Sequence, residues 1–151
     1  MLKTTMESLH ATFDDVAREL VRVLGVNQTD RRALELILRA NEKTTTPGLL
    51  ADQLGLTAAG TTIALDRLEK LGYVTRSRHP TDHRRVVVVA TDLATRRVSE
   101  VLSPLLQRGG NTLMSHYNPA ELALIIEFLT RMDEIQQAHV TEMRTLDPYP
   151  H

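Results

Sequence analysis

The chain has 151 residues, of which 42% are apolar and 25% charged, a composition typical of a folded globular protein rather than a disordered one. It contains no cysteine, which excludes disulfides, thiol catalysis, zinc–thiolate sites and thiol-based redox sensing. Its formal net charge is only −1, so total charge gives no indication of a nucleic-acid partner. The sequence shows neither a signal-peptide pattern nor an apolar run long enough to span a bilayer. We therefore expect a soluble, cytoplasmic protein that does not contact a membrane.

The first half of the chain indicates helices. Residues 7–24 carry apolar side chains at helical spacing, and Gly25 is expected to end that helix. Thr29 is the expected N-cap of a second helix.

Two short helices follow. Thr46 and Pro47 are typical of a helix start, Gly55 of a helix end, and Thr57 opens the segment 58–71, which Gly72 closes. Two short helices joined by the tight turn at 55–57 form a helix-turn-helix arrangement.

After Gly72 the pattern changes to β structure. Residues 73–78 alternate and are rich in β-branched side chains, 79–82 form a turn, and 84–90 form a strong β run, so a β-hairpin is expected. Residues 74–91 hold four arginines against one acid, Asp82. A local basic patch on an otherwise acidic chain can attract phosphate.

The last third of the chain indicates further helices. A helix begins at Thr91–Asp92, Pro104 is expected to kink or end it, and Gly109–Gly110 is a further break point in one bent helical region that extends to about Tyr117. Asn118 is the expected N-cap of a long final helix. The first and last helices have broad apolar faces with little to cover them, which indicates a homodimer; the alternative is that they fold back on their own chain.

The segment 58–71 is the candidate DNA-reading helix, since a major groove admits one α-helix. Its predicted DNA contacts are Thr57, Ala59, Gly60, Thr61, Thr62 and Arg67. Gly60 is equally well explained as a tight helix contact. Ile63, Leu65, Leu68 and Leu71 are mostly expected in the core.

The hairpin is expected to supply the positive charge that meets DNA, and its predicted contacts are Arg76, Arg78, Arg84 and Arg85. Asp82 would repel phosphate, so we expect it to brace the turn through the backbone and to orient a neighbouring arginine. The alternative is a solvated surface loop.

Other chemistry is not expected. His79 and His83 are four residues apart, but Pro80 prevents a helix between them, so no metal site is predicted. No phosphate loop, serine elbow or supported carboxylate pair is present, so we expect neither an enzyme nor a cofactor.

The segment 49–91 contains "DRLEKLGYVTR", then Asp82-His83-Arg84-Arg85 after a proline turn, and a threonine that follows the second strand. In this combination the segment resembles the MarR family of transcription regulators. The resemblance implies a mainly α winged helix-turn-helix fold with a small β-hairpin, and a homodimer that binds a palindromic operator, usually as a repressor. Arg84 would enter the minor groove with Asp82 as its turn partner.

The resemblance also implies a small aromatic or phenolic effector, bound between the dimerisation helices and the DNA-binding part. Candidate ligand-binding residues are Phe13, Met114, Tyr117 and Phe128, each of which also suits plain core packing. Two departures from the family are noted: Ile63 stands where relatives often carry a basic residue, and no glycine precedes the helix after Thr91.

The sequence thus predicts three regions: an N-terminal dimerisation helix over 1–28, the DNA-binding domain over 29–91, and C-terminal dimerisation helices over 92–151. The competing hypothesis is a winged-helix protein-interaction module whose hairpin binds an acidic partner and which binds no operator.

Overall fold

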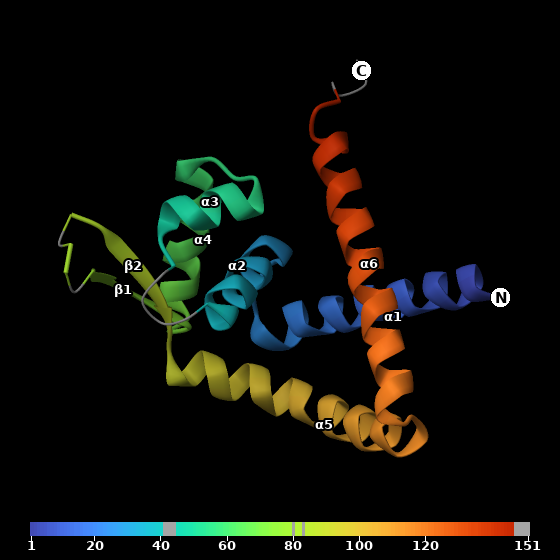
Figure 1. The fold of residues 1–151 in the computed structure, drawn as a ribbon. Helices are drawn as coiled ribbons and strands as arrows, with labels where there is room; N and C mark the ends of the chain where they lie inside the picture. Colours follow the sequence, from blue (N-terminus) through green and yellow to red (C-terminus); the bar gives the residue numbers. More distant parts are fainter. Residues whose placement is uncertain (41–44, 80, 83, 147–151) are drawn as a thin grey trace. The chain divides into compact units, whose positions relative to one another are not determined.

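A computed structural model describes residues 1–40, 45–79, 81–82 and 84–146. In chain order these form α1 (Leu2–Leu24), α2 (Gln28–Arg39), α3 (Pro47–Leu54), α4 (Ala58–Lys70), β1 (Val74–Arg78), β2 (Val86–Ala90), α5 (Asp92–His116) and α6 (Pro119–Met143) (Figure 1). The chain divides into two compact units, Met1–Pro104 and Leu105–His151. None of the helices in the described part of the chain is long and apolar enough to cross a membrane.

Side-chain caps fix most of the helix starts. The hydroxyls of Thr46 and Thr57 accept the backbone N–H groups of Leu49 and Gly60, as their positions predicted. Asn118 forms a reciprocal capping box with Glu121. The prediction for α2 was wrong: Asn27, not Thr29, caps it by accepting the N–H of Asp30, so the helix starts earlier than expected.

The core lies in the first unit. Buried leucines and valines from α1, α2, α3, α4 and both strands form one cluster, with Ala94 of α5. Tyr73, at the start of the hairpin, donates its hydroxyl to the carbonyl of Leu24 at 2.9 Å and so attaches the hairpin to the end of α1. These contacts fix α4 and the hairpin against one scaffold.

The hairpin is antiparallel, with Val74 opposite Ala90 and Arg78 opposite Val86. Val87 and Val88 are buried, which anchors β2 to the core. Beyond β2, the Thr91 hydroxyl donates to the carbonyl of Gly72 at 2.7 Å and accepts the N–H of Ala94 at 3.2 Å. Thr91 therefore joins the base of the hairpin to the start of α5. We call the hairpin with its turn, residues 74–90, the wing.

Helix α5 is continuous from Asp92 to His116. Of the two alternatives expected at Pro104, a kink or an end, the end is excluded, and the break expected at Gly109–Gly110 is absent. One helical region that extends to about Tyr117 was predicted correctly. Because α5 passes through Pro104, it begins in the first unit and ends in the second.

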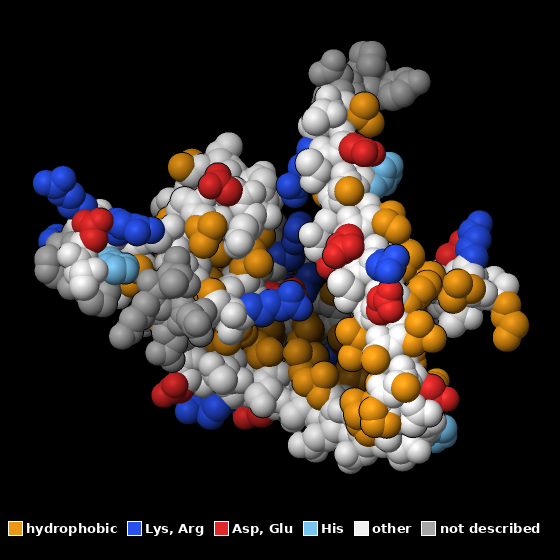
Figure 2. All heavy atoms as spheres, in the orientation of Figure 1, with side chains coloured by type: hydrophobic (Ala, Val, Ile, Leu, Met, Phe, Trp, Pro, Cys, Tyr) orange, Lys and Arg blue, Asp and Glu red, His pale blue; other side chains and the backbone are white. Residues whose placement is uncertain are grey.

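The described residues of the second unit include no buried side chain. Helix α6 nevertheless carries large exposed apolar residues along its length, among them Leu124, Ile126, Leu129 and Ile135, and Figure 2 shows hydrophobic side chains exposed along it. An apolar helix with no buried residue lacks the packing that normally stabilises it.

Candidate nucleic-acid interface

Helix α4 has one buried and one exposed face. Thr61, Ala64, Leu65 and Leu68 point into the core at the spacing of a single helix face. Ala59, Thr62, Ile63 and Asp66 lie on the opposite, solvent-exposed face. This second set is the surface that α4 can offer to a partner, and we call it the reading face.

Thr61 is excluded from this surface. Its side chain is only 2% exposed, and its hydroxyl donates to the carbonyl of Thr57 at 3.0 Å. The prediction that Thr61 contacts DNA was therefore wrong. The expectation that Ile63 and Leu71 belong to the core was wrong as well, because these side chains are 55% and 42% exposed.

The helix backbone also engages the other predicted threonines. The exposed Thr62 donates its hydroxyl proton to the carbonyl of Ala58 at 3.0 Å. Thr57 accepts the N–H of Gly60 at 3.1 Å, which leaves its own hydroxyl proton free for a phosphate. A Cβ at Gly60 would lie 3.3 Å from the Thr57 Oγ1, so Gly60 makes room for this cap.

Arg67 is committed to an internal ion pair. Its Nε and Nη2 donate to the two carboxylate oxygens of Asp30 at 2.8 and 2.6 Å. Asp30 is 1% exposed, so this is a bidentate bond to a buried charge. The hydrogen bonds to Asp30 raise the pKa of the Arg67 guanidinium further above its ordinary value. The pair attaches α4 to α2, a role that was not predicted, and contact of Arg67 with DNA stays a prediction.

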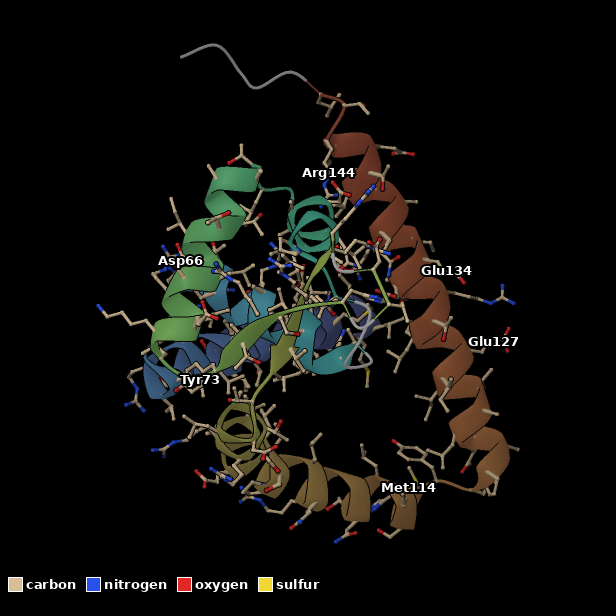
Figure 3. The ribbon with its side chains drawn as sticks, turned by 90° about the vertical axis from the view of Figure 1, so that its left-hand side faces the viewer. Asp66, Tyr73, Met114, Glu127, Glu134 and Arg144 are labelled. Carbon is tan, nitrogen blue, oxygen red and sulfur yellow. The ribbon has the colours of Figure 1, made fainter. Side chains whose placement is uncertain are left out.

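Arg76 is also engaged within the chain. Its guanidinium donates to the Asp66 carboxylate at 2.5 Å and lies 3.8 Å from that of Glu69. These contacts join β1 of the wing to α4, and Figure 3 shows Asp66 on the side of α4 that the view presents. Arg76 thus has internal partners, and its contact with DNA stays a prediction.

The remaining arginines of the wing are exposed. Among the described residues, the guanidinium groups of Arg78, Arg84 and Arg85 form no ion pair. Figure 2 shows Lys and Arg side chains gathered at the end of the hairpin. The wing thus presents unneutralised positive charge next to α4.

The wing turn is held by its own side chains. The N–H of Arg84 donates to the Asp82 carboxylate at 3.2 Å, and the N–H of Arg85 donates to the Asp82 carbonyl at 2.9 Å. This is the backbone brace that the sequence predicted, although the carboxylate holds the backbone of Arg84 rather than its guanidinium. His79 adds a second brace, because its Nδ1 accepts the N–H groups of Thr81 and Asp82.

The bracing role of His79 was missed from the sequence, where its spacing from His83 raised only the question of a metal site. His83 lies outside the described residues. No group of three metal-binding side chains occurs in the described part of the chain. The sequence signal for the brace was the position of His79 as the first residue of the expected His-Pro-Thr-Asp turn.

Comparison with known proteins shows which protein family has this arrangement of helices and wing. A model of the MarR family matches residues 24–85. An uncharacterised HTH-type transcriptional regulator of Bacillus subtilis, YcgE, is 30% identical over 123 residues, which cover 82% of this chain and 78% of that protein. The chain belongs to the MarR family of transcriptional regulators. MarR family members bind DNA and are not enzymes, so this protein is a DNA-binding transcriptional regulator.

Solved structures share the fold of this MarR family chain. A mutant of MepR from S. aureus superposes with a TM-score of 0.71 at 17% identity, covering 90% of this chain and 97% of that one. A transcriptional regulator from Thermotoga maritima gives 0.62 at 19%, covering 93% and 96%. The mainly α winged helix-turn-helix predicted from the sequence is confirmed.

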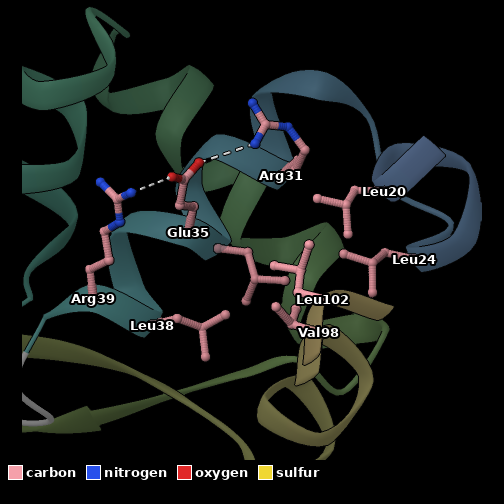
Figure 4. A pocket seen from close by; sticks show the side chains of 9 residues that line it. Leu20, Leu24, Arg31, Glu35, Leu38, Arg39, Val98 and Leu102 are labelled. Atoms are coloured by element: carbon pink, nitrogen blue, oxygen red, sulfur yellow. Dashed lines mark hydrogen bonds and ion pairs between the residues drawn. The ribbon is translucent and has the colours of Figure 1, made fainter. Parts of the chain in front are cut away.

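A separate cavity of about 300 Å³ lies in the first unit of the MarR family fold. Leucines of α1 and α2 and Val98 and Leu102 of α5 form its apolar wall (Figure 4). Arg31, Glu35 and Arg39 form its polar edge, with Glu35 paired to both arginines at 3.1 Å.

None of the four predicted ligand-binding residues lines this cavity. Phe13 is exposed on α1, and Met114, Tyr117 and Phe128 are exposed on the second unit. These four residues therefore do not belong to this cavity, and their role in ligand binding stays a prediction. The Arg31–Glu35–Arg39 spacing on one face of α2 was a readable signal that this prediction overlooked.

Proposed function

We propose that this protein is a homodimeric, ligand-responsive repressor that binds a palindromic operator in the cytoplasm. In this proposal residues 29–91 form the DNA-binding domain, and residues 1–28 and 92–151 carry the dimer contacts. The observation that carries the proposal is the pairing of an exposed α4 face with a wing in which Arg78, Arg84 and Arg85 form no ion pair among the described residues.

The reading face of α4 enters the major groove, and the wing reaches the adjacent minor groove. Arg84 inserts there, held by the turn that Asp82 braces, since a narrow minor groove attracts arginine. Arg78 and Arg85 meet phosphates, as does the Thr57 hydroxyl at the start of α4. A solved MepR mutant of the same fold is bound to an oligodeoxyribonucleotide, which supports DNA binding by this fold.

The test is operator affinity across a salt series. Removing one cationic contact to the DNA backbone lowers the slope of log affinity against log salt by about 1. Arg84→Ala/Arg85→Ala is therefore expected to lower it by at least about 2 in a dimer, from the two copies of Arg85. The matched control is Arg96→Ala/Arg97→Ala, which removes the same charge from α5 and is expected to leave the slope unchanged. Salt-insensitive binding, or equal decreases in both variants, would refute the proposal; a stable protein partner in place of DNA would favour the interaction module.

The cavity between α1, α2 and α5 supports ligand response. Its apolar wall suits an aromatic ring, and Arg31 or Arg39 can exchange Glu35 for the anionic group of a ligand. We expect some member of a panel of aromatic carboxylates and phenols to release the operator from the wild type. Val98→Phe, which fills the cavity, is expected to keep operator binding and to abolish release. Release that is unaffected by Val98→Phe would place the effector elsewhere.

A further inference from the structure

Ile63 is the one large aliphatic side chain on the reading face of α4. A single exposed isoleucine on a protein surface needs no explanation. Here, however, it lies one turn from Ala59 and beside Thr62, at the centre of the face that the proposed function places in the major groove. Its neighbours on the helix, Ala64 and Leu65, supply the core contacts, so the internal packing does not require an isoleucine at this position.

The polar groups of this face are already engaged. The Thr62 hydroxyl donates to Ala58, which leaves its methyl group for outward contact. Asp66 accepts from Arg76, so this carboxylate is partly neutralised and held toward the wing. The hydrogen-bond donors that read guanine from a recognition helix are arginine and lysine.

The cations of α4 do not fill that role. Arg67, one turn after Ile63, is held in a bidentate pair with Asp30, and Lys70 is the last residue of the helix. The central turns of the reading face therefore present methyl groups rather than charged donors. The base feature that matches a methyl group in the major groove is the 5-methyl of thymine.

We propose that Ile63 is a specificity-determining residue that packs against the 5-methyl group of one thymine in each operator half-site. This inference rests on the proposed function, because it requires α4 to lie in the major groove. Thr62 and Ala59 border the same contact. The Asp66–Arg76 pair keeps the neighbouring carboxylate from opposing it.

The experiment replaces thymine by deoxyuridine, which removes only the methyl group, one position at a time in both half-sites of an operator selected from random DNA. At one symmetric position we expect the affinity of the wild type to fall about fourfold per half-site, the effect of exposing one buried methyl group. Ile63→Ala should bind the thymine and deoxyuridine operators equally. Leu71→Ala, which truncates another exposed aliphatic residue at the end of α4, should retain the wild-type preference.

A second variant distinguishes a loss of thymine preference from a general decrease in DNA affinity. Ile63→Val keeps a branched methyl contact and is expected to retain part of the thymine preference. If no position shows a deoxyuridine effect while salt-dependent binding persists, the role of Ile63 is refuted and the proposed function stands. A thymine preference that survives Ile63→Ala also refutes it, and absence of all DNA binding refutes the proposed function together with it.

Discussion

The ion pair between Asp30 and Arg67 is the most consequential single contact in the DNA-binding part. Its two partners differ in environment: Asp30 is buried, whereas about half of the Arg67 side chain reaches solvent. Removing the arginine leaves an uncompensated charge inside the protein, whereas removing the carboxylate leaves an arginine that water can reach. The two single variants should therefore differ in stability.

We expect Arg67→Met to lower the free energy of unfolding by about 3 kcal/mol, the lower end of the range for breaking a buried pair. Asp30→Asn should cost less, and the double variant should be more stable than Arg67→Met alone. Urea denaturation of the three variants measures these differences. If Arg67→Met and the wild type unfold at the same urea concentration, the pair does not stabilise the attachment of α4 to α2.

At this scale the sequence predicted the caps of α3, α4 and α6, because a cap depends on residues three positions apart. It failed at Thr61 and Ile63, although the signal was present: Thr61 falls in register with Ala64, Leu65 and Leu68, and Ile63 does not. Threonine suits a DNA contact and isoleucine suits a core by residue type, but position around the helix decides which of the two side chains is buried. The sequence could not predict the ion-pair partners of Arg67 and Arg76. Asp30 and Arg67, for example, are 37 positions apart and meet only in the fold.

Between elements, the wing is joined to α4 by Arg76, which bridges to Asp66 and Glu69. A partly exposed pair such as this contributes little to stability, about 0–1 kcal/mol. The larger effect of Arg76 is on DNA affinity. It neutralises two carboxylates on α4 that would otherwise repel the phosphates that the wing attracts.

We therefore expect Arg76→Ala to weaken operator binding at least tenfold while it changes the free energy of unfolding by less than about 1 kcal/mol. Arg76→Ala/Asp66→Asn should recover part of this affinity. Arg97→Ala, which breaks the exposed Arg97–Glu100 pair of α5, serves as the control. Operator titrations and urea melts of the same preparations give both quantities. A double variant that binds no better than Arg76→Ala would assign the effect to the arginine's own contact with DNA instead.

The order of elements was predicted well because each has a local signal: helical periodicity, glycine and threonine boundaries, and the β-branched run of the wing. Helix α5 is the exception. Proline and paired glycines disfavour a helix intrinsically, but by amounts that the surrounding turns of a 25-residue helix outweigh.

For the whole molecule, the exposed apolar surface of α6 calls for a partner. No residue of that helix is buried in the single chain, although its exposed side chains include several leucines and isoleucines. Burying such a surface in a second copy releases water from it, and closed twofold pairing is the commonest way that identical chains achieve this. We therefore expect a particle of about 34 kDa in solution, twice the chain mass of 17.0 kDa, by sedimentation equilibrium.

Adding a charge to the apolar surface of α6 tests whether that surface forms the contact between two copies of the chain. Leu129→Glu should dissociate the dimer at micromolar concentration, because an unpaired carboxylate is costly to bury in an apolar contact. Gln136→Glu adds the same charge to an exposed polar position of α6 and should leave the dimer intact. The dissociated variant should also bind a full palindrome no more tightly than a half-site, since the second half-site contributes only when two wings are linked. If the wild type sediments as a monomer, or if both variants remain dimeric, the surface that joins the copies lies outside α6.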